Sequence, residues 1–388
     1  MTSGPGPWAD GDLGLVRDRL AREPGEVTPH RVAQALRESG RPVGDATVLE
    51  VYEALRRDVV GAGPLEPLLR TPGVTDVLVN GAERVYLDRG HGLELSGVRF
   101  PDEEAVRRLA QRLAAAGGRR LDDATPHADL RLPDGTRFHA VLAPVASPGT
   151  LVSLRVPRAR TFTLEELLTA GSLTADAVEL LRAVVASRVA FLVSGGTGTG
   201  KTTLLAALLS LVPPGERIVL VEDAGELRPD HPHVVALEGR PPNIEGAGGI
   251  DLRTLVRQAL RMRPDRLVVG EVRGAEVVEL LAALNTGHEG GCGTLHANSA
   301  LDVPARVEAL ALAAGLGRAA AHSQLASAVD VVLHLTRDRD GHRRLGQVAV
   351  PERGADGLVR MVTALELGPE GPARIGPAGG RLVERLGR

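Results

Sequence analysis

The chain contains the stretch Gly195-Gly196-Thr197-Gly198-Thr199-Gly200-Lys201-Thr202, which satisfies the phosphate-binding loop pattern GxxxxGK[ST]. Lys201 is the only lysine, although lysine and arginine together number 46. A lysine ammonium is a compact charge on a flexible stem and can reach between phosphates inside a tight loop, whereas a planar guanidinium is bulkier. A sequence that uses arginine at every other basic position therefore indicates that this position requires lysine.

The segments on either side of the motif supply the context that a phosphate-binding loop needs. Residues 189–193 form a short apolar run, typical of a strand buried on both faces of a parallel sheet. Residues 203–209 are predicted to form a helix that ends before Pro213. The loop N–H groups and the helix start then face the phosphates of a nucleoside triphosphate, with the Thr202 hydroxyl on Mg²⁺. The predicted nucleotide-binding residues are Gly195, Gly196, Thr197, Gly198, Thr199, Gly200, Lys201, Thr202 and Thr203.

Composition and charge argue against several other classes of protein. The chain has 388 residues, enough for two or three domains, and 43% of them are hydrophobic. No apolar run approaches the ~18 residues of a membrane span, and the Gly/Pro-rich start lacks the features of a signal peptide. The single cysteine, Cys292, excludes an internal disulfide and suits a reducing cytosol. A net charge of −3 and 2% aromatic residues argue against specific nucleic-acid binding.

Sequence patterns predict a helical N-terminal appendage (1–50), an α+β domain (51–158), a linker (159–165) and an α/β domain (166–388). In the α+β domain, strands at 75–79 and 84–88 flank an Asn-Gly turn. Asp102 is expected to cap a helix, and a second hairpin is predicted to run from 129 to 142.

The remaining signals lie in the α/β domain and near its start. A capping box, Thr163 to Glu166, is expected to start the helix that follows the linker. From there to about residue 350, apolar strands alternate with helices, which predicts a parallel sheet. The Gly/Pro-rich residues 368–380 are expected to form a loose tail.

Two later strands are predicted to deliver carboxylates to the edge of the sheet at which ligands bind. The strand at 217–221 is followed by Glu222, Asp223 and Glu226, which could hold Mg²⁺ through water or orient the attacking water. The strand at 266–270 ends in Glu271, placed to polarise water or the Mg²⁺ shell.

Histidines form the last predicted constellation. His288, Cys292 and His296 are spaced four apart, as zinc ligands can be. We disfavour zinc because no fourth ligand is evident and a strand would splay these side chains. Histidines that contact a γ-phosphate or its carboxylate partners fit better.

Four blocks in this order resemble the Walker A, Asp box, atypical Walker B and His box of the type II/type IV secretion ATPases. They occupy residues 195–203, 221–227, 261–274 and 285–299. The stretch 237–246 resembles the branch that serves Tad/Flp pilus assembly. The resemblance departs from an ordinary Walker B strand at Gly270, where an aspartate is usual.

The resemblance implies a RecA-like P-loop NTPase domain preceded by a PAS-like N-terminal domain, assembled into a homo-hexameric ring. Such a ring lies in the cytosol at the inner face of the cytoplasmic membrane, on inner-membrane platform proteins, and hydrolyses ATP with Mg²⁺. It implies catalytic roles for Lys201, Glu226, Glu271, His288 and His296, with Thr202, Glu226 and Glu271 around Mg²⁺. N-terminal-domain arginines of the family contact the nucleotide, and Arg137 and Arg155 match those places; the alternative is a solvated hairpin face.

The sequence thus favours an ATP-hydrolysing motor for pilus assembly or protein secretion. Two alternatives stay open at this point. One is a DNA-handling, RecA-like conjugation ATPase, against which the acidic charge and the scarcity of aromatics argue. The other is a nucleotide-gated scaffold that does not hydrolyse ATP, against which Glu271 argues.

Overall fold

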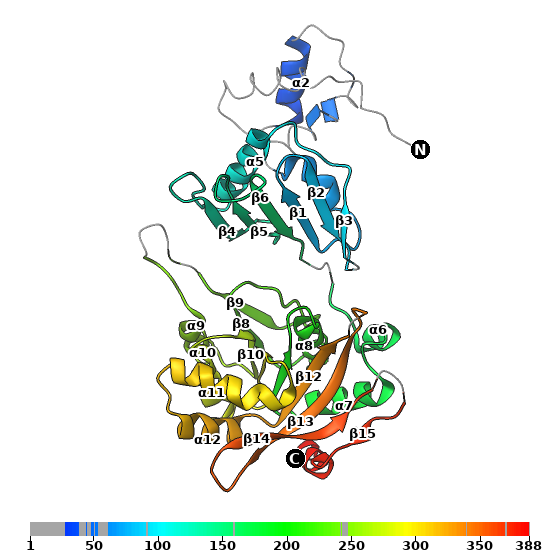
Figure 1. The fold of residues 1–388 in the computed structure, drawn as a ribbon, viewed down its shortest axis with the longest axis vertical. Coiled ribbons are helices and arrows are strands. Elements are labelled where there is room, and N and C mark those ends of the chain that lie inside the picture. The colour runs from blue at the N-terminus through cyan, green and yellow to red at the C-terminus, as the bar shows by residue number, and fades with distance from the viewer. Residues whose placement is uncertain are drawn as a thin grey trace. The chain divides into compact units, whose positions relative to one another are not determined.

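The computed structural model describes residues 28–38, 44, 48–49, 51–52, 61–90, 92–157, 160–240, 242, 247–338, 340–368 and 371–387. The chain divides into two compact units, Met1–Arg158 and Ala159–Arg388 (Figure 1). Residues 1–27 of the helical appendage predicted at 1–50 lie outside the described residues. The finer boundaries at residue 50 and at 159–165 stay predictions.

The first unit contains a six-stranded antiparallel sheet in the order β3-β2-β1-β6-β5-β4. Its strands are β1 (Asp76–Asn80), β2 (Arg84–Asp88), β3 (Leu93–Leu95), β4 (His127–Arg131), β5 (Arg137–Val141) and β6 (Leu151–Arg155). Its helical segments are α2 (Pro29–Glu38), η1 (Gly63–Leu65), α4 (Glu66–Leu69) and α5 (Glu103–Ala116). Both predicted hairpins form, β1 with β2 and β4 with β5.

Helix α5 packs its apolar face into the buried core of this sheet. Asp102 caps it by accepting a hydrogen bond from the N–H of Ala105 at 2.7 Å, which confirms the predicted cap. Leu109 and Leu113 of α5 share a buried cluster with Phe138 of β5. The predicted mixture of a sheet and a packed helix is therefore what this unit contains.

The second unit contains a nine-stranded sheet in the order β15-β14-β13-β12-β7-β11-β10-β8-β9. Six neighbouring strands run parallel: β7 (Phe191–Gly195), β8 (Ile218–Glu222), β9 (Val234–Glu238), β10 (Arg266–Val272), β11 (Cys292–His296) and β12 (Val331–Arg337). The last three are antiparallel: β13 (Arg343–Arg353), β14 (Val359–Glu366) and β15 (Arg374–Ile375).

The predicted parallel α/β sheet is therefore confirmed for the part that carries the phosphate-binding motif. The antiparallel extension was not predicted. Only a few residues join β12 to β13, and a parallel connection needs a crossover of roughly a dozen residues or more. The short connections thus force these strands to reverse direction.

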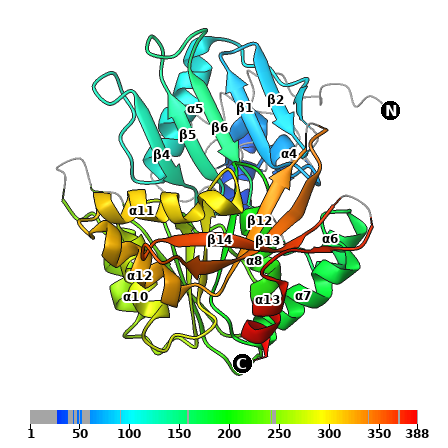
Figure 2. The ribbon, with the colours of Figure 1, turned by 60° about the horizontal axis from the view of Figure 1, so that its bottom comes forward.

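Helices cover both faces of this sheet (Figures 1 and 2). On one face lie α6 (Leu164–Thr169), α7 (Ala175–Ala186), α8 (Lys201–Leu209) and α13 (Gly379–Leu386). On the other lie α9 (Leu252–Ala259), α10 (Glu276–Leu284), α11 (Val303–Ala313) and α12 (Arg318–Ala328), with η2 (Ala300–Asp302) preceding α11. Thr163 starts α6 with the predicted capping box.

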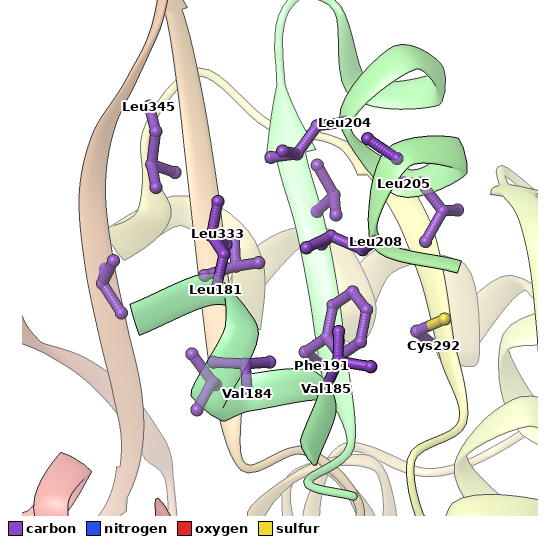
Figure 3. Packing of buried hydrophobic residues seen from close by; sticks show 14 of the residues in the cluster. Leu181, Val184, Val185, Phe191, Leu204, Leu205, Leu208, Cys292, Leu333 and Leu345 are labelled. Atoms are coloured by element: carbon purple, nitrogen blue, oxygen red, sulfur yellow. The ribbon is translucent and has the colours of Figure 1, made fainter. Parts of the chain in front are cut away.

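The strand residues alternate between the two faces. Phe191 of β7 packs with the α7 and α8 side, while its neighbour Leu192 packs with α9 to α12. Figure 3 shows Phe191 and Leu333 of adjacent strands beside Leu208 of α8 and the helix α7. Burial on both faces explains why these strands are continuous apolar runs in the sequence.

The loose tail expected at 368–380 is wrong. β15 pairs with β14, and α13 follows directly. Leu382 is 3% exposed within the core beside α7, and the Ser187 hydroxyl donates to the carbonyl of Leu386 at 2.5 Å. The amphipathic residues after the Gly/Pro-rich stretch bury enough apolar surface to anchor this segment.

Candidate functional site

The phosphate-binding loop joins β7 to α8 and depends on glycine at two places. Gly195 has φ +151°, and a Cβ there would lie 2.6 Å from the carbonyl oxygen of Leu335. Gly200 is the N-cap of α8 in the left-handed region at φ +96°, with no side-chain cap for the first N–H groups of the helix. The loop thus forms a cradle of backbone N–H donors at the positive end of α8, and side chains at these two glycine positions would fill it.

Lys201 lies folded against this loop. Its Nζ donates to the carbonyls of Gly195 at 3.1 Å and Gly196 at 2.8 Å, and the residue is 7% exposed. Burial lowers the pKa of Lys201, while the negative charge of Glu271 acts in the opposite direction. A partly desolvated cation is therefore held where an anion is expected.

Three of the predicted site residues form one chain of contacts. His296 Nδ1 lies 3.4 Å from Lys201 Nζ, and His296 Nε2 lies 2.6 Å from Glu271 Oε1. An ammonium can only donate and a carboxylate only accept, so a neutral imidazole with its proton on Nε2 satisfies both contacts. The structure thus brings the ends of β7, β10 and β11 together through Lys201, Glu271 and His296.

Glu226 and Thr202 lie at the same edge of the sheet without joining this chain of contacts. Glu226 follows β8 and is exposed, and its carboxylate makes no hydrogen bond or ion pair with any other residue that the structure describes. Thr202 is half-buried in the first turn of α8. Both are open to a ligand, so their predicted roles around Mg²⁺ stay predictions.

His288 lies elsewhere. It precedes β11, at the amino edge of the parallel strands, where its Nδ1 lies 3.2 Å from the carbonyl oxygen of Ala283. His296 ends the same strand at the carboxyl edge. The structure therefore does not bring His288 to Lys201, because the whole length of β11 separates the two histidines.

Arg137 and Arg155 belong to the first unit and form ion pairs there. Arg137 pairs with Asp129 at 2.9 Å and Arg155 with Asp76 at 3.0 Å, with arginine side chains 44% and 62% exposed. The two arginines lie opposite each other in the β5–β6 register, so their side chains share one face of the sheet. Surface ion pairs of this kind are weak and do not hold the guanidinium groups firmly.

Two features around the loop were missed from the sequence. Arg343 of β13 donates from Nε to the carbonyl of Gly198 at 2.7 Å, across 145 positions of the chain. Buried His334 of β12 pairs through Nδ1 with the Ser194 hydroxyl at 2.9 Å, one residue before the loop. No local motif marks either residue, since both contacts depend on the β7–β12–β13 neighbourhood.

Comparison with known proteins identifies the family. The family model for type II/IV secretion system proteins matches residues 58–363. The chain belongs to this family. A Mycobacterium tuberculosis protein described as a candidate conjugal transfer protein is 59% identical over 327 residues, which cover 83% of this chain and 93% of the relative. The type IV secretion system protein PtlH of Bordetella pertussis is 36% identical over 261 residues, covering 61% and 76%.

The solved structures agree on the fold. The crystal structure of the pilus retraction motor PilT with ADP aligns with a TM-score of 0.53 and 18% identity, over 83% of this chain and 85% of that one. This type II/IV secretion family member therefore has an N-terminal domain followed by a RecA-like ATPase domain. Family membership supports ATP hydrolysis in a secretion system. Among the described residues, no helix is both long and apolar enough to cross a membrane.

Proposed function

We propose that this family member is a Mg²⁺-dependent ATPase motor that powers Tad/Flp-type pilus assembly or protein secretion across the bacterial inner membrane. The observation that carries the proposal is the chain of contacts from Lys201 through His296 to Glu271 beside the glycine cradle. A cation suited to phosphate and a carboxylate suited to orienting water lie together at one edge of the sheet, which supports the proposal. The Tad/Flp branch rests on the sequence of residues 237–246, of which 241 and 243–246 lie outside the described residues.

The residues of this edge divide the work of hydrolysis. Lys201 moves from the loop carbonyls onto the terminal phosphates and neutralises charge there. Glu271 accepts a proton from the attacking water. The water oxygen bonds to the γ-phosphorus while the bond between that phosphorus and the oxygen of the leaving ADP breaks. His296 orients the Glu271 carboxylate and keeps it from pairing directly with the Lys201 ammonium.

The donor set also fits ATP and Mg²⁺. The uncapped start of α8 and the tight cradle at Gly195 suit phosphate oxygens. Magnesium in such sites needs only one or two protein oxygens besides the phosphates and waters, and Thr202, Glu226 and Glu271 offer them. When bound there, Mg²⁺ would neutralise part of the phosphate charge.

An ATPase assay on purified full-length protein tests the proposal. We expect phosphate release that stops with EDTA, returns with Mg²⁺, and falls about 100-fold or more in Glu271→Gln. Glu279→Gln is the matched control, because Glu279 is a glutamate of α10, with its side chain 13% exposed, that pairs with Arg253 and not with the loop. An equal rate in Glu271→Gln and wild type overturns the mechanism, and ATP binding without turnover favours the scaffold alternative.

Arg137 and Arg155 remain candidates for nucleotide contacts, as the family resemblance implies. Exposed ion pairs like those with Asp129 and Asp76 are weak, so a phosphate can compete with these carboxylates for the guanidinium groups. Alanine at either position is expected to lower kcat/KM for ATP about tenfold or more, with unchanged melting temperature. An unchanged kcat/KM in both variants assigns these arginines to the solvated surface instead.

The assembly and its location follow from the same proposal. We expect a homo-hexamer in the cytosol, peripheral at the inner face of the cytoplasmic membrane on inner-membrane platform proteins. Light scattering with and without nucleotide tests ring size, and co-purification with membrane proteins from neighbouring genes tests the location.

A second candidate function has support from one observation. The Mycobacterium tuberculosis relative carries a name that refers to conjugal transfer, which favours a DNA-handling ATPase. The net charge of −3 argues against DNA binding. DNA affinity that falls steeply with salt, and an ATPase rate stimulated by DNA, would select conjugation over pilus assembly.

A further inference from the structure

Glu222, which the sequence offered as a possible Mg²⁺ partner, is a buried carboxylate turned to backbone N–H groups, and the mechanism above does not use it. It ends β8, is 4% exposed, and its Oε1 accepts hydrogen bonds from the N–H groups of Glu226 and Leu227, both at 3.0 Å. A carboxylate taken out of water is costly unless its partners compensate for the lost hydration. These two N–H groups therefore hold the loop after β8 to the end of the strand.

Gly270 lies beside this carboxylate on the next strand. β8 and β10 are parallel neighbours, with Val221 opposite Val269, so residues 222 and 270 follow side by side. A Cβ on Gly270 would lie 2.6 Å from Cγ and 3.0 Å from Oε1 of Glu222. Because two N–H groups fix Glu222, its side chain cannot simply move aside.

The other side of Gly270 is also occupied. Its carbonyl accepts a hydrogen bond from the Thr294 hydroxyl of β11 at 2.6 Å. The strand is thus held in place from both neighbours at this residue. The position where a Walker B strand usually carries an aspartate has no room for any side chain while Glu222 lies where it does.

We propose that Glu222 is a positioning residue that occupies, from the adjacent strand, the space left by Gly270, and that fixes the loop carrying Glu226. The packing then requires glycine at position 270, because Glu222 and Gly270 form one packing unit. Glu222 acts through the backbone of residues 226 and 227 and does not itself contact the nucleotide. Its effect on turnover rests on the proposed ATPase function, whereas its packing and hydrogen bonding do not.

A double-mutant cycle without nucleotide tests the packing. We expect Gly270→Ala to lower the melting temperature by about 2–10 °C, as overpacking of a well-filled core does. The melting temperature of the double variant Glu222→Ala/Gly270→Ala is expected to fall by less than the sum of the two single-variant losses. If Gly270→Ala alone does not fold, recovery of folded protein in the double variant gives the same answer. If the two losses of melting temperature simply add, Glu222 and Gly270 do not pack as one unit, and the proposal is overturned.

Hydrogen exchange tests the positioning in a way that does not need activity. Glu222→Gln keeps an oxygen acceptor of the same size, so residues 226 and 227 should keep their protection. Glu222→Ala should speed their exchange about tenfold or more. Glu238→Ala is the control, since exposed Glu238 lies opposite Glu222 in the β8–β9 register. Equal protection in all four proteins overturns the positioning role.

Turnover then separates positioning from direct chemistry. We expect Glu222→Gln to keep kcat within about threefold of wild type and Glu222→Ala to lose about tenfold or more, with KM for ATP little changed. An equally large loss in Glu222→Gln means that the charge itself is needed, and overturns the proposal in favour of a direct role. A wild-type protein without ATPase activity would defeat the proposed function alone, because melting and exchange still decide the role of Glu222.

Discussion

Replacing Lys201 by methionine should separate stability from function. In the structure the Lys201 ammonium is buried at 7% exposure and makes contacts of 3.1, 2.8 and 3.4 Å with the Gly195 and Gly196 carbonyls and His296. Each such bond is worth roughly 0.5–1.5 kcal/mol net. Burial of the charged ammonium offsets part of this hydrogen-bond stabilisation and lowers the pKa of Lys201.

The sign of that shift decides the expected stability. A lysine pKa below the unfolded value means that the folded state disfavours the charge, and the full penalty applies at any pH below the folded pKa. Methionine removes this penalty and the three hydrogen bonds together, so we expect a melting temperature within about 3 °C of wild type.

The expected loss of function is much larger. Removing one donor that stabilises charge in a transition state costs about 2.7–4 kcal/mol, which is a factor of about 10²–10³ in kcat. Phosphate release by Lys201→Met, measured beside its melting curve, should therefore fall by about that factor in a normally folded protein. Lys201→Arg should also lose at least tenfold, because the planar guanidinium does not fit among carbonyls about 3 Å from Nζ. A fully active Lys201→Arg enzyme would refute the role of the lone lysine.

Three further predictions concern other parts of the second unit. Burial raises the pKa of the Cys292 thiol to about 12, so labelling at pH 8 should be about 1,000-fold slower in the folded protein than after denaturation. Burial lowers the pKa of His334, so the unfolded state binds more protons below about pH 6.5 and stability should fall there; melting of His334→Gln should be less sensitive to acid. Arg343→Ala should weaken ADP binding about tenfold in fluorescence titrations, because the brace on Gly198 is lost.

Each of these predictions has a control. Serine at Cys292 should abolish labelling in denaturant as well. Melting curves of wild type and His334→Gln that fall in parallel between pH 7 and pH 5 would contradict the linkage. Arg344→Ala is matched to Arg343→Ala, since Arg344 pairs with Asp338 in the same hairpin and does not contact the loop. Equal ADP affinities for the two arginine variants would contradict the brace.

Local patterns predicted most of the elements that build the site. The apolar runs before the phosphate-binding loop and before Glu271 are strands buried on both faces, and the capping residues Asp102 and Thr163 start the predicted helices. These signals depend on neighbours within a few positions of the chain, which is why they can be read without a structure. The anchored C-terminal segment was mistaken because its partners lie far away in the sequence.

The sequence by itself determined the phosphate-binding loop, since only glycines adopt its backbone and a lone lysine marks its charge. Tertiary structure decided which polar residues meet there. Parallel pairing gathers the carboxyl ends of β7, β10 and β11, so that His296 joins Lys201 to Glu271, while β11 carries His288 to the opposite edge. Only the β8–β10 register places Glu222 in the space that a side chain at position 270 would need. That contact depends on packing between strands, which the sequence does not reveal.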